Sequence, residues 1–165
     1  FFQSGPAAAD LLVRTVRATA AGELAAARHV VDAFGGVGLF AATLPGSSAR
    51  VTLVEHSSSA ATDARVNLAG RDAEVVESAV EEWTPAVADL VVADPARRGL
   101  GAGAAAVLAR TQAPTLVLVS CDPVSLARDV ALLAGHGYEH AVTSVLDLFP
   151  HTHHVEAVTK FSRRA

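Results

Sequence analysis

Short, continuous apolar runs alternate along this chain with stretches in which apolar residues recur at helical spacing. The apolar runs predict strands at His29–Phe34, Arg50–Val54, Glu74–Val76, Asp89–Ala93 and Thr115–Ser120. The stretches between them predict helices at about Leu39–Leu44, Ser58–Leu68, Gly103–Thr111 and Val124–Ala134. A further helix is expected near the start, capped by Ser4, with Leu11, Leu12 and Val16 on one face. Strand–helix alternation of this kind predicts an α/β fold with a doubly wound, mostly parallel sheet covered on both faces.

The last part of the chain has a different pattern. Two strand-like runs, Glu139–Phe149 and Val155–Phe161, follow each other with Pro150 and several histidines between them, and no helical stretch separates them. Parallel neighbours need a crossover connection, whereas antiparallel neighbours do not. We therefore expect an antiparallel pair to close the sheet.

Composition places the chain among folded globular domains. It has 165 residues, 51% of them hydrophobic, and a formal charge of −4. No apolar run approaches the length of a membrane span, and one cysteine excludes an internal disulfide. Without a signal-peptide pattern, these features favour a reducing, cytoplasmic setting. Because the chain starts at Phe1 and contains no methionine, we expect residues 1–165 to be one domain of a longer protein.

Glycines mark the turn that follows the first predicted strand. Gly35, Gly36 and Gly38 lie where this strand passes into a helix, so the backbone can approach a ligand closely. Glu55 ends the second strand 20 residues after Gly35, the spacing at which a carboxylate can bind ribose hydroxyls. The pattern indicates a cofactor that contains adenosine. The alternative is a tight turn with a surface glutamate, and a dinucleotide fold would require a further glycine near Ala41.

The only cysteine, Cys121, lies between the Thr115–Ser120 strand and a helix with Pro123 in its first turn. Open α/β sheets bind ligands at the carboxyl ends of their strands, so Cys121 is either a nucleophile or an inert buried thiol. Helix N–H groups are expected to lower the thiol pKa, and Asp122 to oppose that effect.

Carboxylates also occur at two other strand ends. Asp94 ends the fourth strand and is held out of helical geometry by Pro95, although an ordinary turn is the alternative. In the last block, Glu156 could act as a base beside a cysteine on a neighbouring strand. A metal site is the weaker interpretation of this block, which also contains three histidines: His151, His153 and His154.

Six blocks together resemble the S-adenosylmethionine-dependent RNA uracil-5-methyltransferases, which act on transfer RNA and ribosomal RNA. The blocks are PhePheGln at 1–3, AspAlaPheGlyGlyValGlyLeuPhe at 32–40, ValGlu at 54–55, AspProAlaArgArgGly at 94–99, SerCysAspPro at 120–123 with LeuAlaArgAsp after it, and AspLeuPheProHisThrHisHisValGlu at 147–156. They occur in the family's order over nearly the whole chain. The chain departs from the family's frequent residues at Ser4-Gly5, Gly35, Leu39, Ser78 and Ala96.

The resemblance implies a class I, Rossmann-like methyltransferase fold with seven strands, the last antiparallel. It implies Cys121 as nucleophile and Glu156 as base. It also implies a set of residues that bind S-adenosyl-L-methionine: Gln3, Phe34, Gly36, Gly38, Leu39, Glu55, Ser78 and Asp94. Ser78 falls where the family often has an acid or an amide near the adenine. No metal is expected in this chain.

The implied reaction is methyl transfer to carbon 5 of a uridine in tRNA or rRNA through a covalent adduct between Cys121 and carbon 6. Six cationic side chains are candidate phosphate contacts, with solvated surface charge as the alternative for each: Arg97, Arg98, Arg128, Lys160, Arg163 and Arg164. Two other functions remain open. A nicotinamide-dependent dehydrogenase would explain the glycine turn but not Cys121, and a non-catalytic RNA- or cofactor-binding module would bind without turnover. Membrane association is not expected, and the sequence leaves the oligomeric state undetermined.

Overall fold

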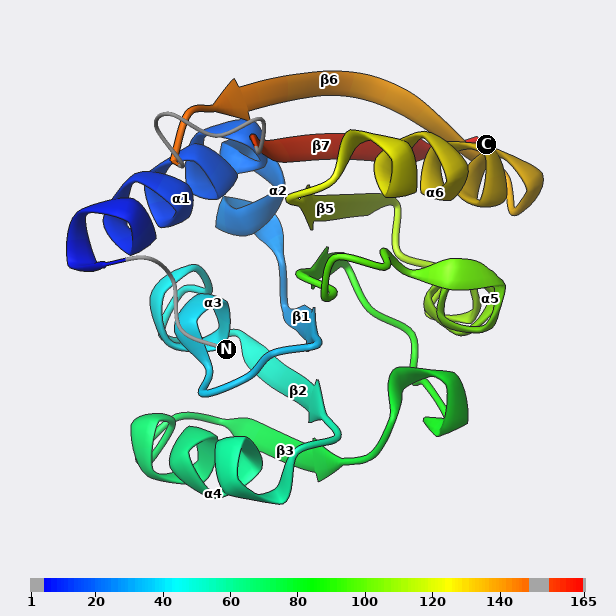
Figure 1. The fold of residues 1–165 in the computed structure, drawn as a ribbon. Coiled ribbons are helices and arrows are strands. Elements are labelled where there is room, and N and C mark those ends of the chain that lie inside the picture. The colour runs from blue at the N-terminus through cyan, green and yellow to red at the C-terminus, as the bar shows by residue number, and fades with distance from the viewer. Residues whose placement is uncertain (1–4, 149–154, 165) are drawn as a thin grey trace.

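The computed structural model describes residues 5–148 and 155–164, which form a seven-stranded sheet with the strand order β3-β2-β1-β4-β5-β7-β6 (Figure 1). The strands are β1 (His29–Ala33), β2 (Arg50–Glu55), β3 (Ala73–Glu77), β4 (Leu90–Ala93), β5 (Thr115–Ser120), β6 (Tyr138–Leu146) and β7 (Glu156–Arg163). Strands β1 to β5 pair in parallel, whereas β7 pairs antiparallel with both β5 and β6. The predicted parallel sheet and its antiparallel closing pair are both confirmed.

The helices are α1 (Pro6–Thr19), α2 (Ala21–Ala26), α3 (Leu39–Thr43), α4 (Ser58–Asn67), α5 (Gly101–Arg110) and α6 (Pro123–Gly135), with a 3-10 turn η1 (Val80–Glu82). Two of these elements, α2 and η1, were not predicted, because segments of six and three residues are too short to show a helical period. The cap of α1 is Gly5, without a side-chain hydrogen bond. The predicted cap, Ser4, lies outside the described residues.

Two layers of helices enclose the sheet. Helices α1, α2 and α3 pack on one face against alternate strand residues that include Val30, Val92, Val119 and Val158. Helices α5 and α6 and the turn η1 pack on the other face. In Figure 1, α1, α3 and α4 lie to the left of the sheet, and α5 and α6 lie to its right. Strands β4 and β5 are buried over their whole length, as expected for strands covered on both faces.

The order of the strands creates a switch point at β1. The chain runs from β1 outward to β2 and β3, then returns to place β4 on the other side of β1. In open α/β sheets, ligands bind beyond the carboxyl ends of the strands at such a point. The loops that follow β1, β2, β4 and β5 meet at this edge.

Candidate functional site

Side-chain alternation along the strands places four reactive groups on one face of the sheet. Val30, Val92 and Val119 pack under α1–α3, so side-chain alternation directs the residues two positions later to the same face, within β1 and one residue beyond the ends of β4 and β5. These are Asp32, Asp94 and Cys121, and Glu156 lies on the same face as Val158 of β7. Since β1, β4, β5 and β7 are consecutive in the sheet, the four groups form one row at its carboxyl edge.

The register of β5 against β7 brings Cys121 and Glu156 together. The last paired residues are Ser120 and Ala157, so continuing the register by one residue sets Cys121, which directly follows β5, opposite Glu156, the first residue of β7. The charge of Glu156 acts on the Cys121 thiol, which agrees with this placement. Glu156 is 4% exposed, and burial raises the pKa of its carboxyl to about 7. Cys121 is only partly buried. The structure thus juxtaposes the two groups that the sequence proposed as nucleophile and base.

The expected lowering of the Cys121 pKa is wrong. Burial, followed by the negative charge of Glu156, raises the pKa of the Cys121 thiol, and a hydrogen bond and positive charge from Arg97 offset part of this increase. Asp122 has a different role from the one expected. It caps α6, because its Oδ2 accepts a hydrogen bond from the Ser125 N–H at 2.7 Å.

Asp94 and Asp32 are the other two carboxyl groups of this row, and with Glu156 they are called the acidic row below. Burial, and then the charges of Glu156 and Asp32, raise the pKa of Asp94 to about 8. Burial also raises the pKa of Asp32 to about 7, against the opposing effect of the Ala41 N–H, which donates to Asp32 Oδ2 at 2.8 Å. Asp32 Oδ1 is buried and has no hydrogen-bond partner among the described residues. Sequence reasoning gave Asp32 no role, although an acid inside a buried strand was a signal that could have identified it.

The glycine turn between β1 and α3 has the backbone conformation that the sequence indicated. Gly36 and Gly38 have φ values of 54° and 91°, and Phe34 also has a positive φ of 60°. A non-glycine residue in this region costs energy and often marks a functional site. A Cβ atom at Gly35 would lie 2.5 Å from Cγ of Leu53, so a larger residue requires this leucine to move. Helix α3 then begins at Leu39, with Gly38 as its cap.

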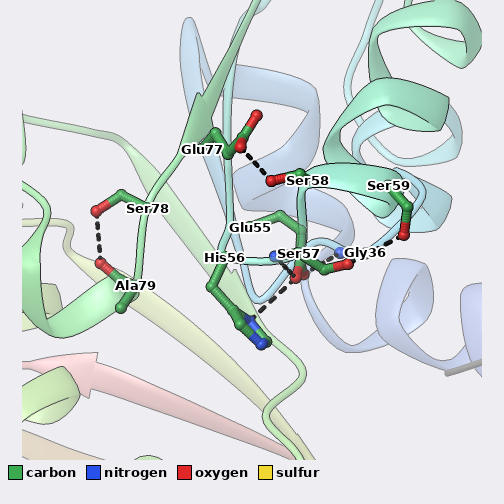
Figure 2. A network of polar contacts seen from close by, with 9 residues as sticks. All are labelled: Gly36, Glu55, His56, Ser57, Ser58, Ser59, Glu77, Ser78 and Ala79. Atoms are coloured by element: carbon green, nitrogen blue, oxygen red, sulfur yellow. Dashed lines mark hydrogen bonds and ion pairs between the residues drawn. The ribbon is translucent and has the colours of Figure 1, made fainter.

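Glu55 connects this turn to the end of β2 (Figure 2). Its Oε2 accepts the Gly36 N–H at 2.9 Å and its Oε1 accepts the Ser57 N–H at 2.7 Å. His56 Nδ1 lies 3.1 Å from Oε1. A carboxylate offers about four acceptor positions, so Glu55 retains capacity on Oε2 for a further donor.

A pocket of about 520 Å³ opens beside Glu55, between the ends of β1, β2, β3 and β4. Its walls include Phe34, His56, Ser78, Arg98 and Leu100. Phe34 and Ser78 thus line the pocket, whereas Gly36, Gly38, Leu39, Glu55 and Asp94 are adjacent parts of the edge rather than its walls. The hydroxyl of Ser78 donates to the carbonyl of Ala79 at 3.0 Å (Figure 2). Gln3, also predicted to bind the cofactor, lies outside the described residues.

The candidate phosphate contacts separate into two groups. Three of them are engaged away from the carboxyl edge. Lys160 forms an ion pair with Glu23, the Arg163 guanidinium donates to the carbonyl of Ala109 at 2.9 Å, and Arg164 pairs with Glu139. The other three lie in the segments that flank the carboxyl edge: Arg97 and Arg98 are exposed in the loop after β4, and Arg128 is exposed on α6.

Within the described residues, no helix is long and apolar enough to cross a membrane, and no three His, Cys, Asp or Glu side chains form a metal-binding group. His151, His153 and His154, which the weaker metal interpretation requires, lie outside those residues.

A scan against models of known protein families gives no match. Curated relatives are found over nearly the whole chain. A protein of Enterococcus faecalis named as an uncharacterized RNA methyltransferase is 34% identical over 99% of this chain and 37% of its own length. Another of the same name from Streptomyces avermitilis is 37% identical over 96% of this chain and 38% of its own length.

Solved structures agree with these relatives. The tRNA (uracil-54, C5)-methyltransferase of Pyrococcus abyssi, in complex with S-adenosyl-L-homocysteine, superposes with a TM-score of 0.83. It is 34% identical to this chain, and the match covers 98% of this chain and 40% of that one. The magnesium protoporphyrin IX methyltransferase of Synechocystis PCC 6803, with a TM-score of 0.71 at 15% identity, shows likeness of fold alone, over 93% of this chain and 83% of that one.

The predicted class I, Rossmann-like methyltransferase fold is therefore confirmed. The chain spans a little over a third of the length of the curated relatives that it matches. By its motifs, its sequence identity and its fold, it belongs to the family of these RNA methyltransferases.

Proposed function

We propose that this chain is the methyl-transfer domain of an RNA uracil-5-methyltransferase that uses S-adenosyl-L-methionine and acts on a uridine of tRNA or rRNA. The observation that carries the proposal is the juxtaposition of a partly exposed Cys121 with a buried Glu156 on the glycine-turn face of the sheet. The identity to the Pyrococcus abyssi enzyme supports carbon 5 of uracil as the acceptor. A dehydrogenase would leave both groups without a role.

The residues at the carboxyl edge fit this cofactor. A pocket of about 520 Å³ between Phe34 and Ser78 is within the usual range for small-molecule sites and suits an adenine ring. Glu55 keeps acceptor capacity for the ribose hydroxyls, and Gly36, Gly38 and Leu39 would lie along the turn. Gln3 is proposed to contact the cofactor on the resemblance alone.

The acidic row fits the charge of the cofactor. Asp32 has a buried oxygen without a hydrogen-bond partner among the described residues, and Asp94 is a partly buried acid on the same face. A cation beside them would favour their ionised forms and reduce the cost of burying them. When bound, S-adenosyl-L-methionine supplies a sulfonium centre with a transferable methyl group.

The chain's own residues account for the remaining chemistry. The Cys121 thiolate attacks carbon 6 of the uracil ring, which forms a carbon–sulfur bond and turns carbon 5 into a nucleophile. After carbon 5 has gained the methyl group, Glu156 removes its proton. The electron pair of that carbon–hydrogen bond restores the ring double bond and expels the thiolate. A carboxyl with a pKa of about 7 is well matched to this proton transfer near neutral pH.

Methyl transfer can be tested with a uridine-containing tRNA or rRNA transcript and isotopically labelled S-adenosyl-L-methionine. We expect labelled 5-methyluridine from the wild-type protein and none from Cys121→Ala. Glu156→Gln is expected to accumulate a protein–RNA adduct, because release requires the base. Product formation by Cys121→Ala would refute the nucleophile assignment. Cofactor and RNA binding without any product would instead identify a non-catalytic binding module.

A further inference from the structure

The loop between β4 and α5 wraps around the carboxylate of Asp129, a residue of α6. This side chain is 2% exposed, and its two oxygens accept the N–H groups of Leu100 at 2.8 Å and Gly101 at 3.2 Å. Gly99 has a φ of 77°, and a Cβ atom there would lie 2.3 Å from Asp129 Oδ2. The loop is thus closed so tightly over the carboxylate that the position next to it accepts only glycine.

A second side chain of the same helix face holds the start of this loop. Ser125 lies one helical turn before Asp129, and its hydroxyl donates to the carbonyl of Arg97 at 2.8 Å. Arg128 in turn donates to this hydroxyl at 2.8 Å. Helix α6 therefore grips the loop at Arg97 through Ser125 and at residues 100–101 through Asp129.

The loop that α6 holds contributes to the surroundings of the Cys121 thiol and to the wall of the pocket. Its Arg97 guanidinium lies close enough to the Cys121 thiol for its positive charge to oppose the effects that raise the thiol pKa. Its next residues, from Arg98 to Gly101, line the pocket together with Phe34 and Ser78. The helix that grips the loop also begins two residues after Cys121. The nucleophile, its cationic neighbour and the pocket wall are consequently fixed to one helix.

We propose that Asp129 is a positioning residue that sets both the reactivity of Cys121, through Arg97, and the shape of the cofactor pocket, through residues 98–101. Asp129 faces the loop backbone rather than the thiol, so it acts through other groups. The effect on Cys121 reactivity (the thiol half) is independent of the proposed function. The effect on the pocket (the pocket half) rests on the proposed function, because that function names the ligand.

The test uses the fact that Cys121 is the only cysteine of the chain, so iodoacetamide alkylation reports on one thiol. Asp129→Asn keeps the size of the side chain but places an amide group against backbone N–H donors. We expect the midpoint of the alkylation-rate profile to move to higher pH, with a rate about threefold lower at pH 7. Glu139→Gln is the matched control, because Glu139 is an exposed carboxylate of β6 that pairs with Arg164.

A double-mutant cycle separates positioning from a general structural effect. In an Arg97→Gln background, Asp129→Asn is expected to leave the thiol profile unchanged, because the group through which it acts is already absent. An equal shift in both backgrounds would overturn the inference. If Asp129→Asn does not fold, Ser125→Ala removes the bond from the Ser125 hydroxyl to the Arg97 carbonyl and the bond that this hydroxyl accepts from Arg128, while Asp129 keeps its bonds to the loop, and the same shift is expected from it.

The pocket half is measured as S-adenosylhomocysteine affinity by calorimetry. We expect Asp129→Asn to weaken binding about tenfold relative to Glu139→Gln, because the wall of the pocket would no longer be held in place before the ligand binds. A tenfold change in affinity corresponds to about 1.4 kcal/mol. Unchanged affinity together with an unchanged thiol profile in a folded Asp129→Asn protein would overturn the proposal. If the wild-type protein fails to bind S-adenosylhomocysteine, the proposed function fails, while alkylation still decides the thiol half because it needs neither cofactor nor RNA.

Discussion

Replacing Glu156 with glutamine should make the Cys121 thiol more reactive while it blocks turnover. The negative charge of Glu156 is among the causes that raise the thiol pKa. Glutamine keeps the shape of the side chain and removes this charge. Loss of the carboxylate therefore favours the thiolate, even though the same change removes the proposed base for product release.

The size of the effect follows from the register of the strands. Side chains opposite each other in an antiparallel pair have Cβ atoms about 5 Å apart, so a register continued by one residue past Ser120 and Ala157 corresponds to a separation of about 6 Å between the sulfur and the carboxylate. Coulomb's law gives about 0.7 kcal/mol in a water-like medium and about 2.8 kcal/mol at an effective dielectric constant of about 20. Because Cys121 is partly exposed, an intermediate value of about 1.4 kcal/mol is appropriate, which changes the thiolate population about tenfold.

Iodoacetamide alkylation at pH 8, where Glu156 is ionised in the wild-type protein, measures this change. A tenfold larger thiolate population is partly offset by a lower intrinsic nucleophilicity, so we expect a net rate increase of about threefold in Glu156→Gln. Glu139→Gln should match the wild-type rate. An unchanged or slower rate in Glu156→Gln would show that the carboxylate and the sulfur do not face each other, and the mechanism would lose its geometric basis.

Three further predictions concern the carboxylates of Asp32 and Asp94 and the arginines Arg98 and Arg128. Because the pKa of Asp94 is about 8 and that of Asp32 about 7, affinity for the cationic cofactor should rise with pH from 6 to 9, with proton release in calorimetry and a weaker trend for S-adenosylhomocysteine. Asp32 has a folded-state pKa above its unfolded one, so the folded state binds more protons and loses stability as pH rises from about 4 to 7. Asp32→Asn should remove up to about 4 kcal/mol of this pH-dependent loss in the free energy of unfolding, measured with denaturant. An equal slope of the unfolding free energy against pH in both proteins would contradict this. Arg98→Ala and Arg128→Ala should each reduce the slope of log affinity for RNA against log salt by about 0.7 to 0.9, whereas Arg164→Ala should not; equal slopes in all three would place the RNA elsewhere.

The sequence was most informative where one periodicity persisted. Thr115–Ser120 was predicted with both of its bounds, because a six-residue aliphatic run is closed by a turn and a proline. Boundaries were less accurate where polar residues sit inside an element, as at β6, which ends at Leu146 rather than Phe149 among the described residues. The parallel pairing of the first five strands also followed from general rules, since alternating strands and helices form parallel sheets, whereas the order of the strands was not predicted.

The electrostatics of the site could not be read from the sequence. The pKa of Cys121 was expected to fall because a helix starts nearby, but burial and a carboxylate across the β5–β7 pair outweigh that effect. The sequence named Glu156 as a base near Cys121, but the effect of its charge on the thiol pKa depends on how closely the strand register brings the two groups together. The grip of Asp129 on the loop after β4 likewise joins residues 28 and 29 positions apart, so it emerges only in three dimensions.

The most direct test of the central claim is to locate the covalent bond itself. The protein is incubated with S-adenosyl-L-methionine and an RNA in which 5-fluorouridine replaces uridine, and the digested adduct is mapped by mass spectrometry. With fluorine on carbon 5 there is no proton for the base to remove, so the thiolate cannot be expelled. The account therefore predicts a trapped, methylated nucleotide attached to the peptide that contains Cys121. Methylation without any adduct, or an adduct on another residue, would contradict the account.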